Sequence, residues 1–292
     1  MTALWQRQPV GIAGLGLIGG SLGLDLIARG AEVRALVHRE ATALRARERG
    51  LATTVSTDPG VLAGCGLVVL ALPLDQLLDP APDLLAALPA QAVITDVGSV
   101  KGPVLAAWQA RLGADAGRFV ASHPMAGTAR AGVEAGERDL FRGRPWVVTP
   151  GETTDPEAVQ AVRQLAEALG AKWLSCDAAD HDRAVALISH LPVLVSAALL
   201  QAADQGAAQA GGGLPQLVRA LASSGFADTT RVGGGNPELG LWMARWNRQA
   251  LLEGLRAYRL ALAELERQVE NQDWPRLQAS LADGQRLRPE FL

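Results

Sequence analysis

The segment Pro9-Val10-Gly11-Ile12-Ala13-Gly14-Leu15-Gly16-Leu17-Ile18-Gly19 decides the fold of this chain. Its first five residues form a short apolar run, which predicts a buried strand. A G-x-G-x-x-G turn and an apolar helical pattern follow, which is the order that a dinucleotide site requires. Such a turn lets backbone N–H groups approach a pyrophosphate at a helix N-terminus. We therefore expect a dinucleotide to bind at Gly14, Leu15, Gly16, Leu17, Ile18 and Gly19. The alternative, a glycine turn without a ligand, is disfavoured by this context.

Short apolar runs alternate with amphipathic stretches on both sides of the turn. Further strands are expected at residues 33–37, 67–71 and 92–95. Helices are expected at residues 17–29, 40–49, 74–87 and 104–112. The pattern continues more weakly through residues 119–120, 146–148, 156–169 and 172–174. Strands that are apolar on both faces and separated by helices predict a doubly wound parallel sheet, an α/β Rossmann-type domain.

The strand signal stops after Cys176, and the remainder is helical with glycine breaks at 211–213 and 233–235. We therefore expect two domains, a Rossmann-type domain at residues 1–176 and an all-helical domain at residues 177–292.

One late helix, at about residues 248–271, carries an apolar stripe. Its spacing of 4, 3, 4, 3 and 4 is typical of a short coiled-coil seam formed by Leu251, Leu255, Tyr258, Leu262, Leu265 and Val269. Two interpretations stay open, which are packing within the chain and an interface between two copies.

The composition excludes several classes of protein. The chain has 292 residues, 49% hydrophobic residues, a formal net charge of −3 and two cysteines. Its basic residues are scattered, so no nucleic-acid footprint is present. No signal peptide is visible, and the two cysteines have no zinc-binding spacing. The most apolar stretch, residues 184–203, contains polar residues and predicts a core helix rather than a membrane span. We expect a cytoplasmic protein that binds neither nucleic acid nor membranes.

The end of the second expected strand indicates the cofactor. An NAD site usually has Asp or Glu there to bind the ribose 2′-hydroxyl. Here the strand ends in Val37-His38-Arg39. A guanidinium suits a 2′-phosphate by charge and geometry, so His38 and Arg39 favour NADP. Because Glu40 is adjacent and Arg39 could be an ordinary surface residue, NAD remains the alternative.

Further polar motifs follow in a distinctive order. They are TDVGSVK (residues 95–101), SHPMAGT (122–128), DHD (180–182), ISHLP (188–192) and DTTRVGGGNPEL (228–239). Together with GLGLIGGSLG (14–23), these strings resemble the prephenate/arogenate dehydrogenase family of tyrosine biosynthesis over nearly the whole chain. They are most similar to the cyanobacterial and plant-like arogenate branch, which tends to use NADP. The resemblance implies a homodimer formed through the helical domain, which would also bind substrate.

The resemblance implies three principal roles. His123 would be the catalytic base that takes the proton of the ring hydroxyl, which requires an imidazole with a pKa near neutral and no metal. Hydride would leave the same carbon for the nicotinamide, and loss of the ring carboxylate as CO2 would complete the aromatic ring. Ser99 would orient the imidazole, and Arg231 would bind the ring carboxylate. The structural alternatives are a loop histidine, a helix-capping serine and a surface arginine.

The other predicted site residues lie in these motifs or, for Leu72 and Pro73, directly after the expected strand at residues 67–71. Leu72, Pro73 and Asp96 are expected at the cofactor, and Gly127, Thr128 and His190 at the substrate. His181 and His190 are nine positions apart, which puts them on opposite faces of a regular helix. A metal site shared by these two histidines is therefore not expected.

Two departures from the family pattern bear on the substrate. Val193 stands where members that use prephenate often have a histidine, and Ala227 where many relatives have a basic residue. A less cationic pocket favours arogenate, which carries an ammonium group, over prephenate, although prephenate remains the alternative.

Two other functions compete with this interpretation. A β-hydroxyacid dehydrogenase usually needs a catalytic lysine in a G-x-x-x-K helix, and the only lysines, Lys101 and Lys172, do not match that context. A non-catalytic dinucleotide sensor would not need His123.

Overall fold

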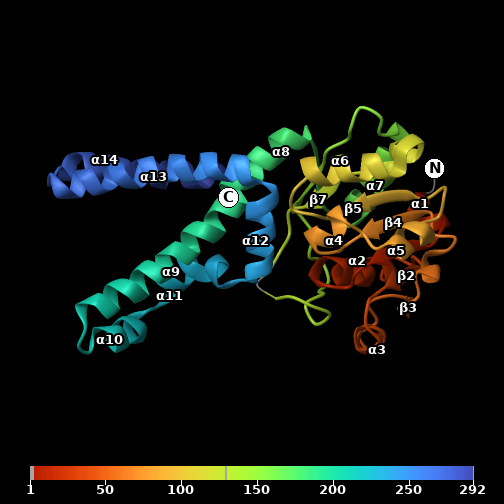
Figure 1. Cartoon of the computed structure of the whole chain (residues 1–292), viewed down its shortest axis with the longest axis horizontal. Coiled ribbons are helices and arrows are strands. Elements are labelled where there is room, and N and C mark those ends of the chain that lie inside the picture. The colour runs from red at the N-terminus through yellow and green to blue at the C-terminus, as the bar shows by residue number, and fades with distance from the viewer. Residues whose placement is uncertain (1–2, 129, 292) are drawn as a thin grey trace.

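The computed structural model describes residues 3–128 and 130–291. The chain forms an α/β half and a helical half, which lie side by side along the longest axis (Figure 1). The N-terminal helix α1 (Leu4–Arg7) lies at the outer end of the α/β half.

A six-stranded parallel sheet forms the centre of the α/β half. Its strands lie in the order β3-β2-β1-β4-β5-β6. This order is that of dinucleotide-binding sheets, and it confirms the predicted fold class. Their bounds are β1 Val10–Ala13, β2 Val33–Leu36, β3 Thr54–Ser56, β4 Leu67–Leu70, β5 Val93–Asp96 and β6 Phe119–Val120. The short β3 was not predicted, because two of its three residues are polar.

Helices cover both faces of this sheet, and each face has its own hydrophobic core. One core contains side chains of α2 (Leu17–Ile27), α3 (Glu40–Glu48) and α7 (Pro156–Ala168). The other contains side chains of α4 (Leu74–Leu78), α5 (Pro82–Ala87) and α6 (Gly102–Leu112). The single helix expected at residues 74–87 is therefore two helices. Pro80 and Pro82 explain the break, because proline lacks the N–H that continues a helix.

The last three strands form a separate sheet in the order β7-β8-β9. They are β7 (Ser122–Pro124), β8 (Pro145–Val148) and β9 (Lys172–Ser175). The expectation that this part of the chain continues the parallel sheet is wrong. β7 runs antiparallel to β8, and the residue between β6 and β7, Ala121, accepts a hydrogen bond from Thr149 N at 2.9 Å. This turn of the chain places His123 on β7, beside the carboxyl end of β5.

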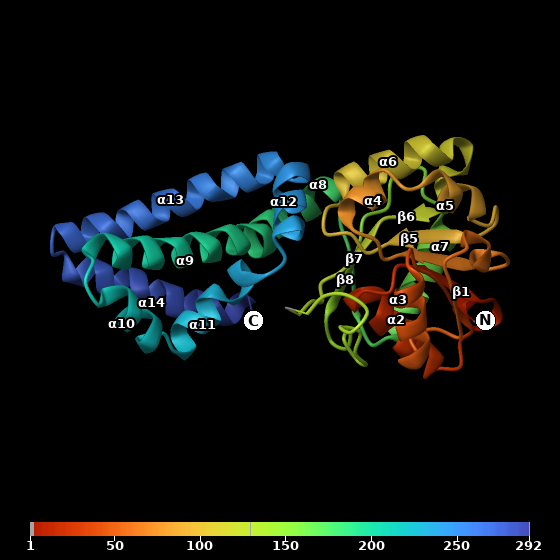
Figure 2. The same ribbon diagram turned by 60° about the horizontal axis from the view of Figure 1, so that its bottom comes forward.

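The helical half contains seven α-helices in its described residues, and Figure 2 shows the long ones side by side. A π-helical segment, Ala186–His190, joins α8 and α9 into one continuous helix. The bounds are α8 Ala178–Val185, α9 Leu191–Ala210, α10 Leu214–Leu221, α11 Ser224–Thr230, α12 Pro237–Trp246, α13 Arg248–Glu270 and α14 Trp274–Phe291.

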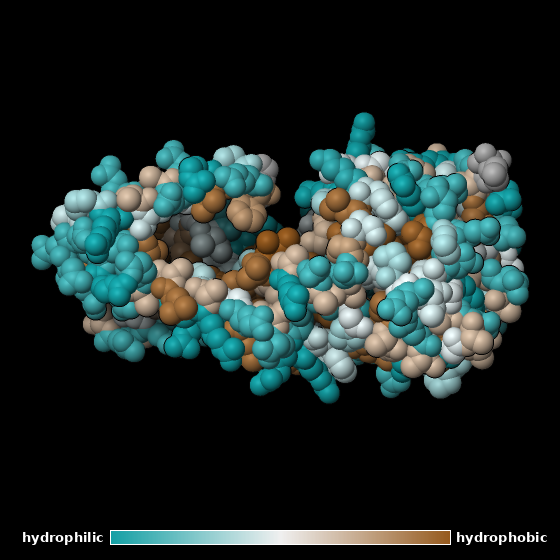
Figure 3. Space-filling view, turned by 90° about the horizontal axis from the view of Figure 1, so that it is seen from above, coloured by the Kyte–Doolittle hydropathy of each residue, from teal (hydrophilic) through white to brown (hydrophobic). Residues whose placement is uncertain are grey.

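The long apolar helix is not a core helix of the single chain, which corrects the prediction for residues 184–203. The continuous helix 178–210 is long and apolar enough to span a membrane by composition alone, but only 22% of its most apolar window is buried. Apolar side chains surround a hollow in the helical half (Figure 3). On α13, Leu251 is buried, whereas Tyr258, Leu262 and Val269 are exposed. Packing within the chain thus covers only part of the predicted stripe.

Candidate active site

The glycine turn after β1 has the geometry of a phosphate cradle. Gly14 has φ +95°, and a Cβ on it would lie 2.3 Å from the carbonyl oxygen of Ala71. A Cβ on Gly19 would lie 1.9 Å from the carbonyl oxygen of Gly14, so a side chain is excluded at both positions. A Cβ on Gly16, by contrast, would meet nothing within 4 Å, and Gly16 is the N-cap of α2. This open space at a helix N-terminus fits a pyrophosphate.

Most of the residues predicted to contact the rest of the cofactor follow strands that neighbour β1 in the sheet. Leu72 follows β4 and approaches the turn, where its Cδ2 would be 3.4 Å from a Cβ on Gly14. His38 and Arg39 follow β2 and are exposed. The carboxylate of Glu40 pairs with Arg47 at 2.9 Å, whereas no ion pair engages Arg39 within residues 3–128 and 130–291. The guanidinium of Arg39 is therefore available to a ligand.

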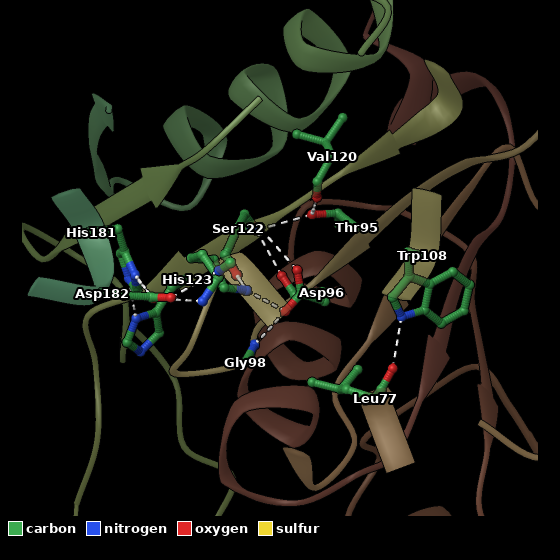
Figure 4. A network of polar contacts seen from close by, with 12 residues as sticks. Leu77, Thr95, Asp96, Gly98, Trp108, Val120, Ser122, His123, His181 and Asp182 are labelled. Carbon is green, nitrogen blue, oxygen red and sulfur yellow. Dashed lines mark hydrogen bonds and ion pairs between the residues drawn. The ribbon is translucent and has the colours of Figure 1, made fainter. Parts of the chain in front are cut away.

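The carboxylate of Asp96 has a structural role in this structure, and its predicted contact with the cofactor stays a prediction. It is fully buried at the end of β5 and forms an ion pair with the equally buried Lys101. It also accepts hydrogen bonds from Ser122 N at 3.0 Å and Gly98 N at 2.8 Å. Lys101 Nζ donates a second hydrogen bond to Ser122 O at 2.7 Å. This network fixes the loop after β5 against β7, next to His123 (Figure 4).

His123 contacts a second histidine rather than the predicted serine. Its Nδ1 lies 3.0 Å from Nε2 of His181, and Nδ1 of His181 lies 2.8 Å from Oδ1 of Asp182 (Figure 4). The Oγ of Ser99 is buried without a hydrogen-bond partner among the described residues. In this structure Nδ1 of His123 contacts His181 and not Ser99, so the orienting role of Ser99 stays a prediction. A role for Ser99 toward a ligand stays a prediction as well.

Asp182 connects the two halves of the molecule. Its oxygens accept hydrogen bonds from the backbone N–H groups of Lys101 (2.7 Å) and Gly102 (2.9 Å), at the start of α6. Its backbone carbonyl accepts a hydrogen bond from Nδ2 of Asn247 at 2.6 Å. The same Nδ2 donates to Nδ1 of His190 at 3.2 Å. A carboxylate on α8 thus caps a helix of the α/β half, while α8 and α13 hold His190 nearby.

His181 and His190 lie in one cluster, although a regular helix would put them on opposite faces. The π-helical segment at residues 186–190 explains the difference. Each π turn contains one residue more than an α turn, which rotates the following positions by roughly 100°. The opposite-face prediction is thus wrong because the helix is not regular. No group of three or more side chains suited to a metal ion occurs among the described residues.

The environment favours neutral imidazoles at this site. Burial lowers the pKa of His123 well below its ordinary range, and the neighbouring His181, Lys101 and His190 lower it further. Burial likewise lowers the pKa of His190 to about 4. The pKa of His123 thus lies below the near-neutral value expected from the sequence, because a desolvated imidazole beside a cation resists protonation.

The predicted substrate residues Arg231, Gly127 and Thr128 are exposed. No hydrogen bond joins them to His123 within the described ranges, so their roles stay predictions. Arg231 begins the 3-10 turn Arg231–Gly234, which packs tightly on α9. A Cβ on Gly233 would lie 2.4 Å from Ala197 N, and Gly233 N donates to Ser196 Oγ at 2.9 Å. The glycines after Arg231 thus allow the close approach that fixes its position.

Sequence reasoning missed His181, Asp182 and Asn247 as functional candidates. The DHD string was the available signal, because adjacent imidazole and carboxylate groups can form a hydrogen-bonded pair. Nothing in the sequence indicated that this pair would face His123, which is 58 residues away.

Comparisons with known proteins agree with the division into an α/β half and a helical half. The family model described as the nucleotide-binding domain of prephenate dehydrogenase matches residues 22–175, and that described as its dimerization domain matches residues 177–283. The chain is 28% identical to a prephenate dehydrogenase of Bacillus subtilis over 92% of this chain and 72% of that protein.

Two solved structures extend the comparison. A Synechocystis arogenate dehydrogenase is 42% identical, with a TM-score of 0.79 over 97% of this chain and 100% of that one. A prephenate dehydrogenase from A. aeolicus in complex with hydroxyphenyl propionate and NAD+ is 25% identical, with a TM-score of 0.87 over 98% of this chain and 99% of that one. The chain therefore belongs to the prephenate/arogenate dehydrogenase family of oxidoreductases.

Proposed function

We propose that this protein is an NADP-dependent arogenate dehydrogenase, which converts arogenate to tyrosine with loss of CO2. The observation that carries the proposal is His123, a neutral imidazole on β7 at the carboxyl end of the parallel sheet that also holds the phosphate cradle. Similarity to the Synechocystis arogenate dehydrogenase supports the choice of substrate. Prephenate with NAD is the second candidate, since the A. aeolicus relative binds NAD+.

The residues of this chain have distinct parts in the proposed reaction. The backbone around Gly16 holds the dinucleotide, whose nicotinamide accepts hydride when bound. Arg231 binds the ring carboxylate of the substrate. His123 takes the proton from the ring hydroxyl as the C–H bond on the same carbon breaks. Loss of the carboxylate as CO2 then leaves an aromatic ring, whose phenolate oxygen takes the proton back from the protonated base, so that the neutral imidazole is regenerated.

Turnover with four substrate pairs tests the proposal. Purified protein is mixed with arogenate or prephenate, each with NADP or NAD, and formation of reduced nicotinamide is followed by absorbance. We expect the highest kcat/KM with arogenate and NADP. Turnover only with prephenate and NAD would reverse both assignments of specificity, and no turnover with any pair would contradict the proposed activity.

The preference for NADP should depend on Arg39. Replacement of Arg39 by glutamine is expected to raise KM for NADP by roughly 10- to 100-fold, because a hydrogen bond to a charged group contributes about 1.5–3 kcal/mol. KM for NAD should change little, since NAD lacks the 2′-phosphate. Arg163→Gln, which removes an exposed guanidinium on α7, is the control. Equal changes with both cofactors in Arg39→Gln would exclude a contact with the 2′-phosphate.

The low pKa of His123 predicts the pH dependence of the reaction. A general base must be unprotonated, so kcat/KM should increase as pH rises through the pKa of His123 in the free enzyme and then level off. Because burial lowers this pKa, the fall in kcat/KM on acidification should be centred below pH 6.5. Initial rates at low substrate concentration across the neutral and acidic range measure it. A fall centred above pH 6.5 would contradict the assignment.

We also propose that the protein is a cytoplasmic homodimer. The matched family model for residues 177–283 is that of a dimerization domain, and the exposed apolar residues of α13 suit contact with a second copy. Sedimentation of the purified protein tests the dimer.

A further inference from the structure

We propose that His181 and Asp182 are positioning residues that form a proton relay with His123. They fix the proton of His123 on Nδ1 and accept positive charge when His123 takes the substrate proton. The catalytic part of this inference rests on the proposed function, whereas the protonation pattern is a property of the protein alone.

The hydrogen bonds determine which nitrogen carries each proton. The carboxylate of Asp182 can only accept, so Nδ1 of His181 must carry the proton of the 2.8 Å contact. In a neutral imidazole, Nε2 of His181 is then an acceptor. The 3.0 Å contact therefore requires a proton on Nδ1 of His123. This leaves the lone pair of His123 on Nε2, which is the form a general base needs.

The relay runs from the site into the protein interior. His123 is partly exposed, whereas His181 and Asp182 are 3% and 8% exposed. The N–H groups of Lys101 and Gly102 hold the carboxylate in place, so it cannot turn away from His181. The other charged or titratable groups that influence His123 are Lys101, whose ammonium pairs with Asp96, and His190, whose pKa is about 4. Asp182 is thus the anion hydrogen-bonded to the two-histidine pair.

The proton can be followed through the proposed step. As the substrate O–H bond breaks, its proton forms a bond to Nε2 of His123. The proton on Nδ1 of His123 can then move to Nε2 of His181, whose new positive charge lies 2.8 Å from the carboxylate of Asp182. One proton enters and one shifts, and the resulting cation lies next to an anion. A protonated His123 is unfavourable because its imidazole is desolvated. Transfer of the positive charge to His181, beside the carboxylate of Asp182, compensates for this cost.

The relay also makes the base depend on the contact between the two halves. His123 lies on β7 of the α/β half, while His181 and Asp182 lie on α8 of the helical half. Separation of the halves would remove the acceptor from Nδ1 and allow either nitrogen of His123 to carry the proton. His123 is therefore fixed in the basic form only when α8 packs on the start of α6.

Nitrogen NMR of the imidazoles tests the protonation pattern without substrate. In the 15N-labelled full-length wild type at neutral pH, we expect the signals of His123 and His181 to report a proton on Nδ1 and an unprotonated Nε2 in each ring. In Asp182→Asn and in a His181→Phe variant, His123 should show exchange between the two forms. A wild-type His123 that carries its proton on Nε2 would overturn the proposal.

Kinetics test the catalytic part. By comparison with the buried aspartate of serine-protease triads, whose asparagine variant loses roughly 10⁴-fold in kcat, we expect Asp182→Asn to lose about 10²- to 10⁴-fold with little change in KM. The acid limb of the pH profile of kcat/KM for Asp182→Asn should move to lower pH, because this variant lacks the anion that stabilises the protonated pair of His123 and His181. His181→Gln keeps an acceptor for Nδ1 but cannot take a proton, so it should retain more activity than His181→Phe. Asp180→Asn, on the exposed face of α8, is the matched control.

The outcomes separate this inference from the proposed function. If wild type turns over and the His181 and Asp182 variants keep its kcat and pH profile, the relay is wrong and the dehydrogenase assignment stands. If wild type turns over none of the four pairs, the proposed activity fails, while NMR still decides the protonation pattern. Asp182 also caps α6, so His181→Gln, which leaves that cap intact, carries the test if Asp182→Asn does not fold.

Discussion

Replacement of His123 by asparagine is expected to lower kcat by about 10²- to 10⁴-fold, because general-base catalysis contributes a factor of that size. The amide of asparagine can form hydrogen bonds of similar geometry but cannot take up a proton at neutral pH. The Kd for NADP should stay close to that of wild type, because the phosphate cradle follows β1, whereas His123 lies on β7. Steady-state kinetics and calorimetric titration with NADP measure the two quantities.

A further observation sharpens this prediction. The factor by which His123→Asn is less active than wild type should be similar at all pH values above the acid limb of the wild-type pH profile, because the variant lacks the base itself. Activity like that of wild type in His123→Asn would remove the proposed base. Loss of NADP binding together with activity would instead indicate a disrupted fold.

Replacement of Lys101 by methionine is expected to lower the free energy of unfolding by about 3–5 kcal/mol, because it leaves a buried carboxylate without its counterion. Lys101 and Asp96 are both fully buried, and desolvation lowers the pKa of Lys101 while Asp96 opposes the shift. The two backbone N–H groups that bind Asp96 offset only part of the lost ion pair. Urea denaturation followed by circular dichroism measures the change.

The chain offers a matched control, since Lys172 is its only other lysine. Lys172 is exposed on β9, so Lys172→Met should change stability by less than about 0.5 kcal/mol. The double variant Lys101→Met with Asp96→Asn should recover much of the loss, because no buried charge remains unpaired. If Lys101→Met were as stable as Lys172→Met, the ion pair would not hold the loop after β5.

The elements of the α/β half could be predicted where neighbouring residues determine them. The runs at β1 and β4 are apolar throughout and buried on both faces, and those at β2 and β5 are short and largely apolar. Two predictions for this half were wrong, and each has an identifiable physical cause. Two prolines divide one expected helix, and β7 reverses direction after β6, so the weaker strands form a second sheet. Periodicity alone does not report the direction of a strand.

The candidate site was predictable in part. The motifs that contain His123, Asp96 and His190 indicated where chemistry-bearing side chains lie along the chain. Their contacts were not indicated. Asp96 and Lys101 share one motif, but only burial makes them an ion pair, and His190 reaches the cluster through a π-helical turn and a contact with the distant Asn247.

The sequence by itself determined the glycine turn at residues 14–19, because a buried strand, a G-x-G-x-x-G turn and a helix follow one another directly along the chain. It likewise determined the parallel sheet and the position of His123 after its last strand. Only the tertiary structure decided which groups surround that imidazole. His181 and Asp182 come from the helical half, and contacts between distant segments form only when both halves pack together. The protonated nitrogen of His123 is therefore a consequence of domain packing, while the cradle for its cofactor is a consequence of local backbone geometry.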